Sequence, residues 1–123
     1  MRTVDWADGA VRMIDQRKLP FEFGTVDLHS AAEVAEAITN MTVRGAPAIG
    51  ASAAFGMALA AKTSSATTVD RLRDDLRAAA SLLKASRPTA VNLMWAVDNM
   101  MTIAEGMFES ADGLREHLLA AAK

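Results

Sequence analysis

Two arginines in this chain each stand directly before a predicted apolar helix. Arg44 is followed by Gly45, Ala46 and Pro47, and residues 48–61 are then uncharged and mostly small or apolar. Pro47 suits the first turn of a helix, because its missing N–H would have no intrahelical partner there. Free backbone N–H groups, the positive end of the helix dipole and a guanidinium together favour an anion. This stretch therefore predicts an anion site at the start of a buried helix.

A purely structural interpretation of the same stretch stays open. Gly45 would then only relieve a tight turn, and Arg44 would only pair with a carboxylate. The stretch is shorter than a P-loop and lacks the Lys-Ser/Thr pair that follows one.

A second segment repeats the arrangement. Arg87 precedes Pro88, which disfavours helical backbone at the arginine. Thr89 is the predicted N-cap of the next helix, with Asn92 as its partner in the first turn and an apolar helix over residues 94–107. Two arginines beside two helix starts suit one phosphate, or a phosphate and the adjacent sugar.

Asn92 and Trp95 are two further candidates for the lining of a substrate cleft. Asn92 either completes the helix cap or contacts sugar hydroxyls. Trp95 stands two turns beyond Arg87, and it either lines the cleft or packs against the neighbouring buried helix. His29 and His117 have no companion histidine or acidic cluster at ligand spacing, so the sequence predicts no metal site and no catalytic histidine.

The motifs as a set resemble the methylthioribose-1-phosphate isomerase family. The resemblance rests on Asp15-Gln16 with Leu19-Pro20, on residues 41–56, and on the segment from Arg87 to Leu93 with Trp95-Ala96. That family belongs to a larger group with archaeal ribose-1,5-bisphosphate isomerases and regulatory subunits of eukaryotic initiation factor 2B. Within that group, the isomerase branch carries both arginine-containing motifs, Val43 to Gly50 and Arg87 to Leu93.

The resemblance implies a role for individual residues. Arg44, Gly45, Ala46 and Arg87 match the family's substrate contacts. The family's catalytic cysteine and aspartate lie in a second, Rossmann-like domain, and this chain has no cysteine. We therefore expect no catalytic residue within residues 1–123, a catalytic domain after residue 123, and no activity from this chain alone.

The resemblance also implies the reaction, which converts 5-methylthioribose 1-phosphate to 5-methylthioribulose 1-phosphate in methionine salvage. It implies no metal or organic cofactor, a homodimer as the complete enzyme, and the second domain as a partner of this one. Two alternatives remain: a ribose-1,5-bisphosphate or related sugar-phosphate isomerase, and a non-catalytic regulatory module. The regulatory module would need an exposed partner-binding patch and would tolerate loss of Arg44.

Length and composition favour one helical domain. The chain has 123 residues, 51% of them hydrophobic but only 5% aromatic, which favours helices over sheets. The net charge of −2 gives no signal for nucleic acid or membrane partners. The apolar run over 41–61 is long enough to be considered as a membrane span, but Arg44 and Pro47 favour a buried helix. We expect a cytoplasmic protein.

The pattern predicts a mainly α fold with about five helices and a small antiparallel β element. Asp8-Gly9 between two β-compatible runs indicates a hairpin. The expected strands cover residues 3–6, 10–14 and 21–26, and the expected helices cover 30–40, 48–62, 68–85, 94–107 and 114–122. Residues 1–27 would form a β-rich arm and residues 28–123 a helix bundle.

Two helix starts and one helix contact are predicted in more detail. Ser30 is a candidate N-cap, with Glu33 at the capping-box position. Either Thr68 or Asp70 begins the helix that ends near residue 85. The helices that begin near Pro47 and Thr89 are expected to pack side by side, with Gly50, Ala54 and Ala58 at their contact.

Overall fold

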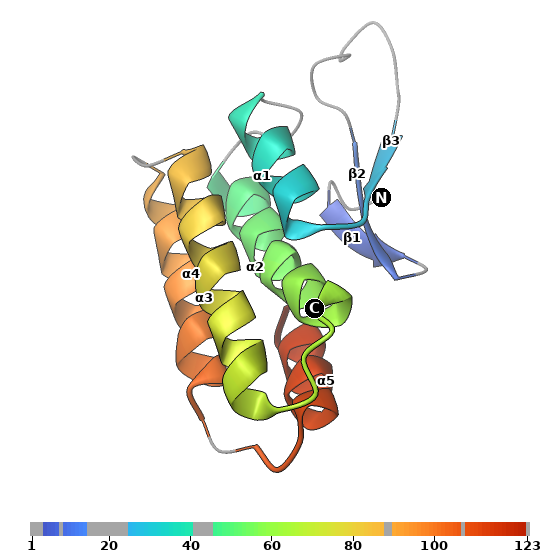
Figure 1. Cartoon of the computed structure of the whole chain (residues 1–123). Helices are drawn as coiled ribbons and strands as arrows, with labels where there is room; N and C mark the ends of the chain where they lie inside the picture. The colour runs from blue at the N-terminus through green and yellow to red at the C-terminus, as the bar shows by residue number, and fades with distance from the viewer. Residues whose placement is uncertain are drawn as a thin grey trace, which may run out of the picture.

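The computed structural model describes residues 4–7, 9–14, 25–40, 46–87, 90–106 and 108–122. In this part of the chain it contains a three-stranded sheet and five helices, which confirms the mainly α fold (Figure 1). The strands are β1 (Val4–Ala7), β2 (Ala10–Ile14) and β3 (Thr25–Leu28), and the helices are α1 (Ala31–Thr39), α2 (Ala46–Thr63), α3 (Val69–Ser86), α4 (Val91–Ala104) and α5 (Ala111–Ala122).

The sheet is antiparallel, with the strands in the order β1-β2-β3. Ala7 pairs with Ala10, and Gly9 has a φ of 77°, a left-handed conformation that glycine adopts without steric cost. These features confirm the predicted hairpin. The positive φ at the turn also explains why a glycine stands at this position.

The third strand lies later in the sequence than predicted. It covers Thr25–Leu28, whereas the expected strand ended at Val26 and residues 21–24 lie outside the described part. The strand extends because Arg12 donates two hydrogen bonds to Asp27 across the sheet, at 2.8 and 3.0 Å, and because Leu28 is buried opposite Val11.

Helix α2 lies at the centre of the molecule, in contact with α1, α3, α4, α5 and the sheet (Figure 1). Its residues Phe55, Met57 and Leu59 are fully buried. A helix that carries no charge before Lys62 in its last turn and is apolar on every side is stable only in such a position. Trp6 of β1 stacks on Phe55, with ring centroids 6.1 Å apart, so the hairpin is attached directly to the central helix.

The predicted N-cap of α1 is confirmed, and α3 begins after Thr68, one of its two predicted first residues. Ser30 Oγ accepts a hydrogen bond from the Glu33 N–H at 3.2 Å, and Glu33 Oε1 accepts one from the His29 N–H at 3.4 Å. Thr68 Oγ1 accepts from the Arg71 N–H at 3.3 Å. Each bond satisfies a donor at a helix end or beside it.

The prediction of Thr89 as the N-cap of α4 is wrong. The N-cap is Ala90, which makes no side-chain capping bond, and α4 begins at Val91 and ends at Ala104. The Ala90 N–H donates to the Arg87 carbonyl at 3.0 Å, and this turn makes Ala90 the last extended residue before the helix. Asn92 is therefore the second residue of the helix and is not needed for its cap.

Helix α5 also begins earlier than predicted. The expected helix begins at residue 114, whereas the observed helix begins at Ala111. Ser110 Oγ accepts a hydrogen bond from the Gly113 N–H at 3.0 Å. The Ser110 carbonyl accepts from the Leu114 N–H at 3.2 Å, so Ser110 caps a first turn that starts at Ala111.

The predicted contact between α2 and α4 is confirmed in part. A Cβ built on Gly50 would lie 3.6 Å from the Asn92 backbone oxygen, so Gly50 faces α4. Ala54 lies beside α4 residues in a groove that both helices line. Ala58 was placed wrongly, because it lies with Trp6 and Leu119, toward β1 and α5.

None of the helices in the described ranges is both long and apolar enough to cross a membrane.

Candidate functional site

Helices α2 and α4 begin at the same end of the bundle, where α1 and α3 end (Figure 1). Gly50 in the second turn of α2 lies against Asn92 in the first turn of α4, so the two helices run parallel from adjacent starts. Thr39 Oγ1 donates to the Ser86 carbonyl at 3.2 Å and joins the two helices that end there. The backbone N–H groups in the first turns of α2 and α4 therefore point toward the same end of the bundle.

Of the four predicted anion-binding residues, two lie in the part of the chain that the structure describes. Arg44 and Gly45 lie outside the described residues. Ala46 is the first residue of α2, so its N–H belongs to the helix start. Arg87 is the residue that ends α3, and its carbonyl holds the turn into α4. The structure therefore places Ala46 and Arg87 at the starts of the two adjacent helices.

Arg87 differs from the other half-buried arginines in the described part of the chain. Arg12 pairs with Asp27, and the guanidinium groups of Arg73 and Arg115 each bond to backbone carbonyls and to one aspartate. For Arg87 no ion pair or side-chain hydrogen bond is found among the described residues. Its guanidinium nitrogens are open to solvent, since no side-chain nitrogen that is buried lacks a partner among the described residues. A half-buried guanidinium without a partner in the described part of the chain is therefore available to bind an anionic ligand.

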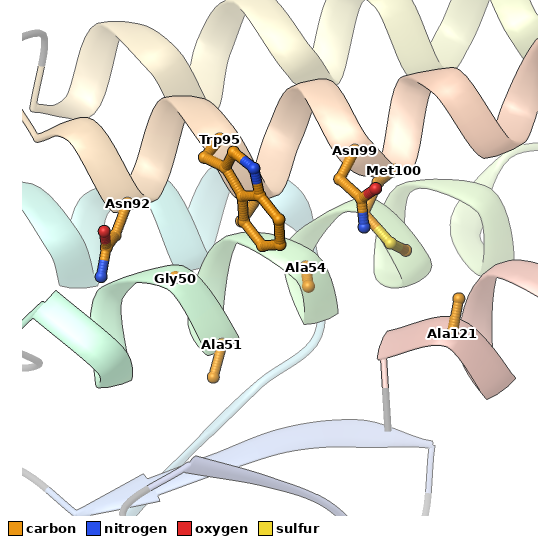
Figure 2. Close-up of a pocket in the computed structure, with 9 residues that line it drawn as sticks. Gly50, Ala51, Ala54, Asn92, Trp95, Asn99, Met100 and Ala121 are labelled. Atoms are coloured by element: carbon orange, nitrogen blue, oxygen red, sulfur yellow. The ribbon is translucent and has the colours of Figure 1, made fainter.

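A groove leads away from this end of the bundle between α2 and α4. Its volume is about 510 Å³, within the range of small-molecule sites. Figure 2 shows Asn92, Trp95 and Asn99 projecting from α4 over α2, where Gly50, Ala51 and Ala54 form the opposite wall. Ala96 and Met100 of α4 and Ala121 of α5 complete the lining.

Both cleft candidates from the sequence line this groove. Trp95 is 70% exposed, so its indole is not packed into the core between α2 and α4. Asn92 is exposed as well. Asn99 and Met100 are groove residues that the sequence reasoning missed. The signal was present, since residues 92, 95 and 99 follow the spacing of one helix face.

At the C-terminal ends of α2 and α4, two arginines donate hydrogen bonds to backbone carbonyls. Arg115 Nε donates to the Ala61 carbonyl at 2.7 Å, and its Nη2 donates to the carbonyls of Ser64 and Ala66 at 2.9 and 2.7 Å. Arg73 Nε donates to the Ala104 carbonyl at 2.7 Å. Cations at helix C-termini are favourable, so α2 and α4 are capped at these ends. At its other end α4 has no side-chain cap, because its N-cap residue is Ala90.

The described residues offer no acid–base pair beside the groove. His29 is exposed ahead of α1, and His117 of α5 is exposed with its ring 5.4 Å from the ring of Phe108. Within the ranges that the structure describes, no group of three or more His, Asp or Glu residues could hold a metal ion. The hydrogen bonds from Arg12 lower the pKa of Asp27, but this carboxylate belongs to the sheet.

Two relatives of this chain carry the name methylthioribose-1-phosphate isomerase. The methylthioribose-1-phosphate isomerase of Pseudomonas fluorescens is 49% identical over 117 residues, which are 93% of this chain and 32% of that protein. The protein of the same name from Herpetosiphon aurantiacus is 47% identical over 124 residues, 100% of this chain and 35% of that one. This chain thus spans about a third of the length of the relatives it matches.

Solved structures agree on the fold. The crystal structure of 5-methylthioribose 1-phosphate isomerase from Pyrococcus horikoshii OT3 superposes with a TM-score of 0.90 at 45% identity, over 98% of this chain and 34% of that one. Translation initiation factor eIF-2B subunit delta from A. fulgidus superposes with a TM-score of 0.91 at 38% identity, over 99% and 35%.

Residues 42–123 match the initiation factor 2 subunit family. The match begins just before α2 and takes in all of α2–α5, including both helix starts and the groove between them. The chain belongs to the initiation factor 2 subunit family.

Proposed function

We propose that this chain is the N-terminal, phosphate-binding part of an isomerase that converts 5-methylthioribose 1-phosphate to 5-methylthioribulose 1-phosphate. The observation that carries the proposal is Arg87, half-buried and without an ion pair among the described residues, beside the adjacent starts of α2 and α4. The relatives of 47–49% identity that carry the isomerase name support the substrate.

The reaction needs an anchor at the phosphate. The bond between carbon 1 and the ring oxygen breaks, the hydrogen on carbon 2 moves to carbon 1, and the carbon 2 hydroxyl becomes a carbonyl as its proton passes to the ring oxygen. The phosphate on carbon 1 stays attached throughout. Holding it fixes the reacting carbons in place while the ring opens, which is how positioning contributes to rate.

In this proposal four residues hold the substrate oxygens. Arg44 and Arg87 neutralise the phosphate and orient it, and the backbone N–H groups of Gly45 and Ala46 add donors that need no reorganisation. The acid–base chemistry belongs to a second, Rossmann-like domain in a longer protein. Homodimer assembly and cytoplasmic location are parts of the same proposal.

A chimaera tests the proposal directly. Residues 1–123 replace the aligned segment of the Pseudomonas fluorescens isomerase, and turnover of 5-methylthioribose 1-phosphate is measured. We expect an active chimaera, while purified residues 1–123 alone should give no turnover because they lack an acid–base pair. A folded chimaera without activity toward any sugar phosphate would contradict the proposal.

A regulatory role is the second candidate, because the eIF-2B delta structure superposes as well as the isomerase structure does. The same chimaera separates the two roles. A purely regulatory chain would not support turnover, and alanine at position 44 would not affect its function.

A further inference from the structure

The groove between α2 and α4 is uncharged along its whole described lining. Its walls are small residues of α2, the side chains of Asn92, Trp95 and Asn99, and Met100. No lysine or arginine is among the described residues that line it. A second phosphate placed in this groove would lose its hydration without gaining a cation, which is unfavourable.

The groove begins within the first two turns of α2 and α4, at the end of the bundle where Arg87 ends α3. Gly50 and Asn92 line its near end, within the first two turns of α2 and α4, and Met100 and Ala121 line its far end. From Asn92 to Asn99 the helix rises by about 10 Å. A sugar phosphate anchored by its phosphate at the helix starts can therefore extend along the groove.

The chemistry of the lining changes along that direction. Asn92 at the near end offers an amide that can donate to and accept from sugar hydroxyls. Trp95 comes next and is 70% exposed, although its large indole would be favourably buried. Met100 beyond it is a polarizable apolar side chain. The order is thus the phosphate end, the Asn92 amide, and then the apolar side chains of Trp95 and Met100 with the Asn99 amide beside them.

We propose that this groove binds the pentose of the substrate together with an uncharged, apolar substituent on carbon 5, and that Trp95 selects this substituent. The inference rests on the proposed function and adds the direction in which the substrate lies. Asn92 bonds the hydroxyls nearest the phosphate, and Asn99 bounds the far side of the substituent. The groove thereby selects 5-methylthioribose 1-phosphate over ribose 1,5-bisphosphate.

Substrate discrimination in the chimaera is the test. The quantity measured is the ratio of kcat/KM for 5-methylthioribose 1-phosphate to kcat/KM for ribose 1-phosphate, which has a hydroxyl in place of the methylthio group. We expect Trp95→Ala to lower this ratio by about tenfold or more, since loss of apolar contact to a small group has that size of effect. Trp95→Phe should keep most of the ratio.

The second arm uses ribose 1,5-bisphosphate. We expect the parent chimaera to use it poorly, and Trp95→Lys to raise its kcat/KM relative to the methylthio substrate by placing a cation in the groove. Leu82→Ala is the matched control, because Leu82 is a 44% exposed apolar residue of α3 that does not line the groove. Leu82→Ala should leave both ratios unchanged.

Three results would overturn the inference. These are an unchanged ratio in Trp95→Ala, a parent that prefers the bisphosphate, and a Trp95→Ala chimaera that loses thermal stability with its discrimination intact. In the last case another segment of protein covers the indole. In each of these three results the chimaera is still an active isomerase. They are therefore distinguishable from failure of the proposed function, in which the chimaera is inactive toward every sugar phosphate.

Discussion

A Cβ built on Gly56 would lie 3.2 Å from both terminal methyl carbons of Leu83. The same atom would lie 3.2 Å from Cγ1 of Val34, and both neighbouring side chains are fully buried. At Gly56, α2 therefore approaches α1 and α3 so closely that Leu83 and Val34 would have to shift by a few tenths of an ångström to accept a methyl group. Gly50 is different, because its nearest atoms lie at ordinary contact distance.

Alanine substitutions at the two glycines should have opposite effects on stability. Gly56→Ala should lower the free energy of unfolding by about 1–2 kcal/mol, because overpacking outweighs the gain in helix propensity. Gly50→Ala, in the same helix, should be neutral or stabilise by up to about 1 kcal/mol. Chemical denaturation of residues 1–123 measures both, and equal effects of the two substitutions would contradict the packing described for Gly56.

Arg115 should matter for stability more than an exposed arginine does. It donates to three carbonyls at and beyond the end of α2, so Arg115→Ala should cost about 2–3 kcal/mol. Arg115→Lys should recover only part, since lysine lacks the planar fork. The control is Arg71→Ala on the exposed side of α3, expected within about 0.5 kcal/mol of the parent in the same denaturation experiment. If Arg115→Ala lowers the free energy of unfolding by no more than the Arg71→Ala control does, Arg115 does not cap the C-terminal end of α2.

The Arg12–Asp27 pair should make stability depend on pH in the acid range. The hydrogen bonds from Arg12 lower the pKa of Asp27 in the folded state, so the unfolded chain binds this proton first as pH falls. The contribution is therefore complete above the ordinary Asp pKa of about 3.9 and is lost as pH falls through the lower folded value.

The measurement is the melting temperature at pH 7 and near pH 2.5. Asp27→Asn should show a smaller fall between the two conditions than the parent does. In an Arg12→Met background the same change should make little further difference, because the partner is already gone. An identical fall in the parent and in Asp27→Asn would refute the coupling.

Much of the fold follows from local pattern. The central position of α2 was predictable because residues 46–61 carry no charge and such a helix is unfavourable in water. Ser30 indicated the start of α1 by its capping side chain, and Thr68 was one of two residues predicted to begin α3. The N-cap of α4 could not be predicted from a capping side chain, because Ala90 has none. It depends on a turn between the Ala90 N–H and the Arg87 carbonyl, and backbone geometry leaves no side-chain signature.

Long-range partners account for the other differences. The role of Arg115 was hidden because its carbonyl acceptors lie some fifty residues earlier in the sequence. Ala58 was placed at the wrong contact because α2 is apolar all round, so periodicity does not say which face meets which neighbour. The candidate cleft was visible in Asn92 and Trp95, but its extent to Asn99 and Met100 required the position of α2 opposite them.

The central claim is that Arg44 and Arg87 bind one substrate phosphate. If they do, Arg44→Ala and Arg87→Ala in the chimaera should each weaken catalysis without affecting the fold. The double variant should then be non-additive because both residues act on the same ligand. Lysine at either position should rescue only in part, since it keeps the charge and loses the bidentate geometry.

The most direct measurement is kcat/KM of the Arg87→Ala chimaera for 5-methylthioribose 1-phosphate, beside that of the Arg71→Ala control. We expect Arg87→Ala to lose about 1.5–3 kcal/mol of transition-state stabilisation, or roughly 10- to 150-fold in kcat/KM, with an unchanged melting temperature. Arg71→Ala should keep full activity. If Arg87→Ala keeps its kcat/KM, or changes only the melting temperature, Arg87 is structural and the phosphate site at the starts of α2 and α4 is contradicted.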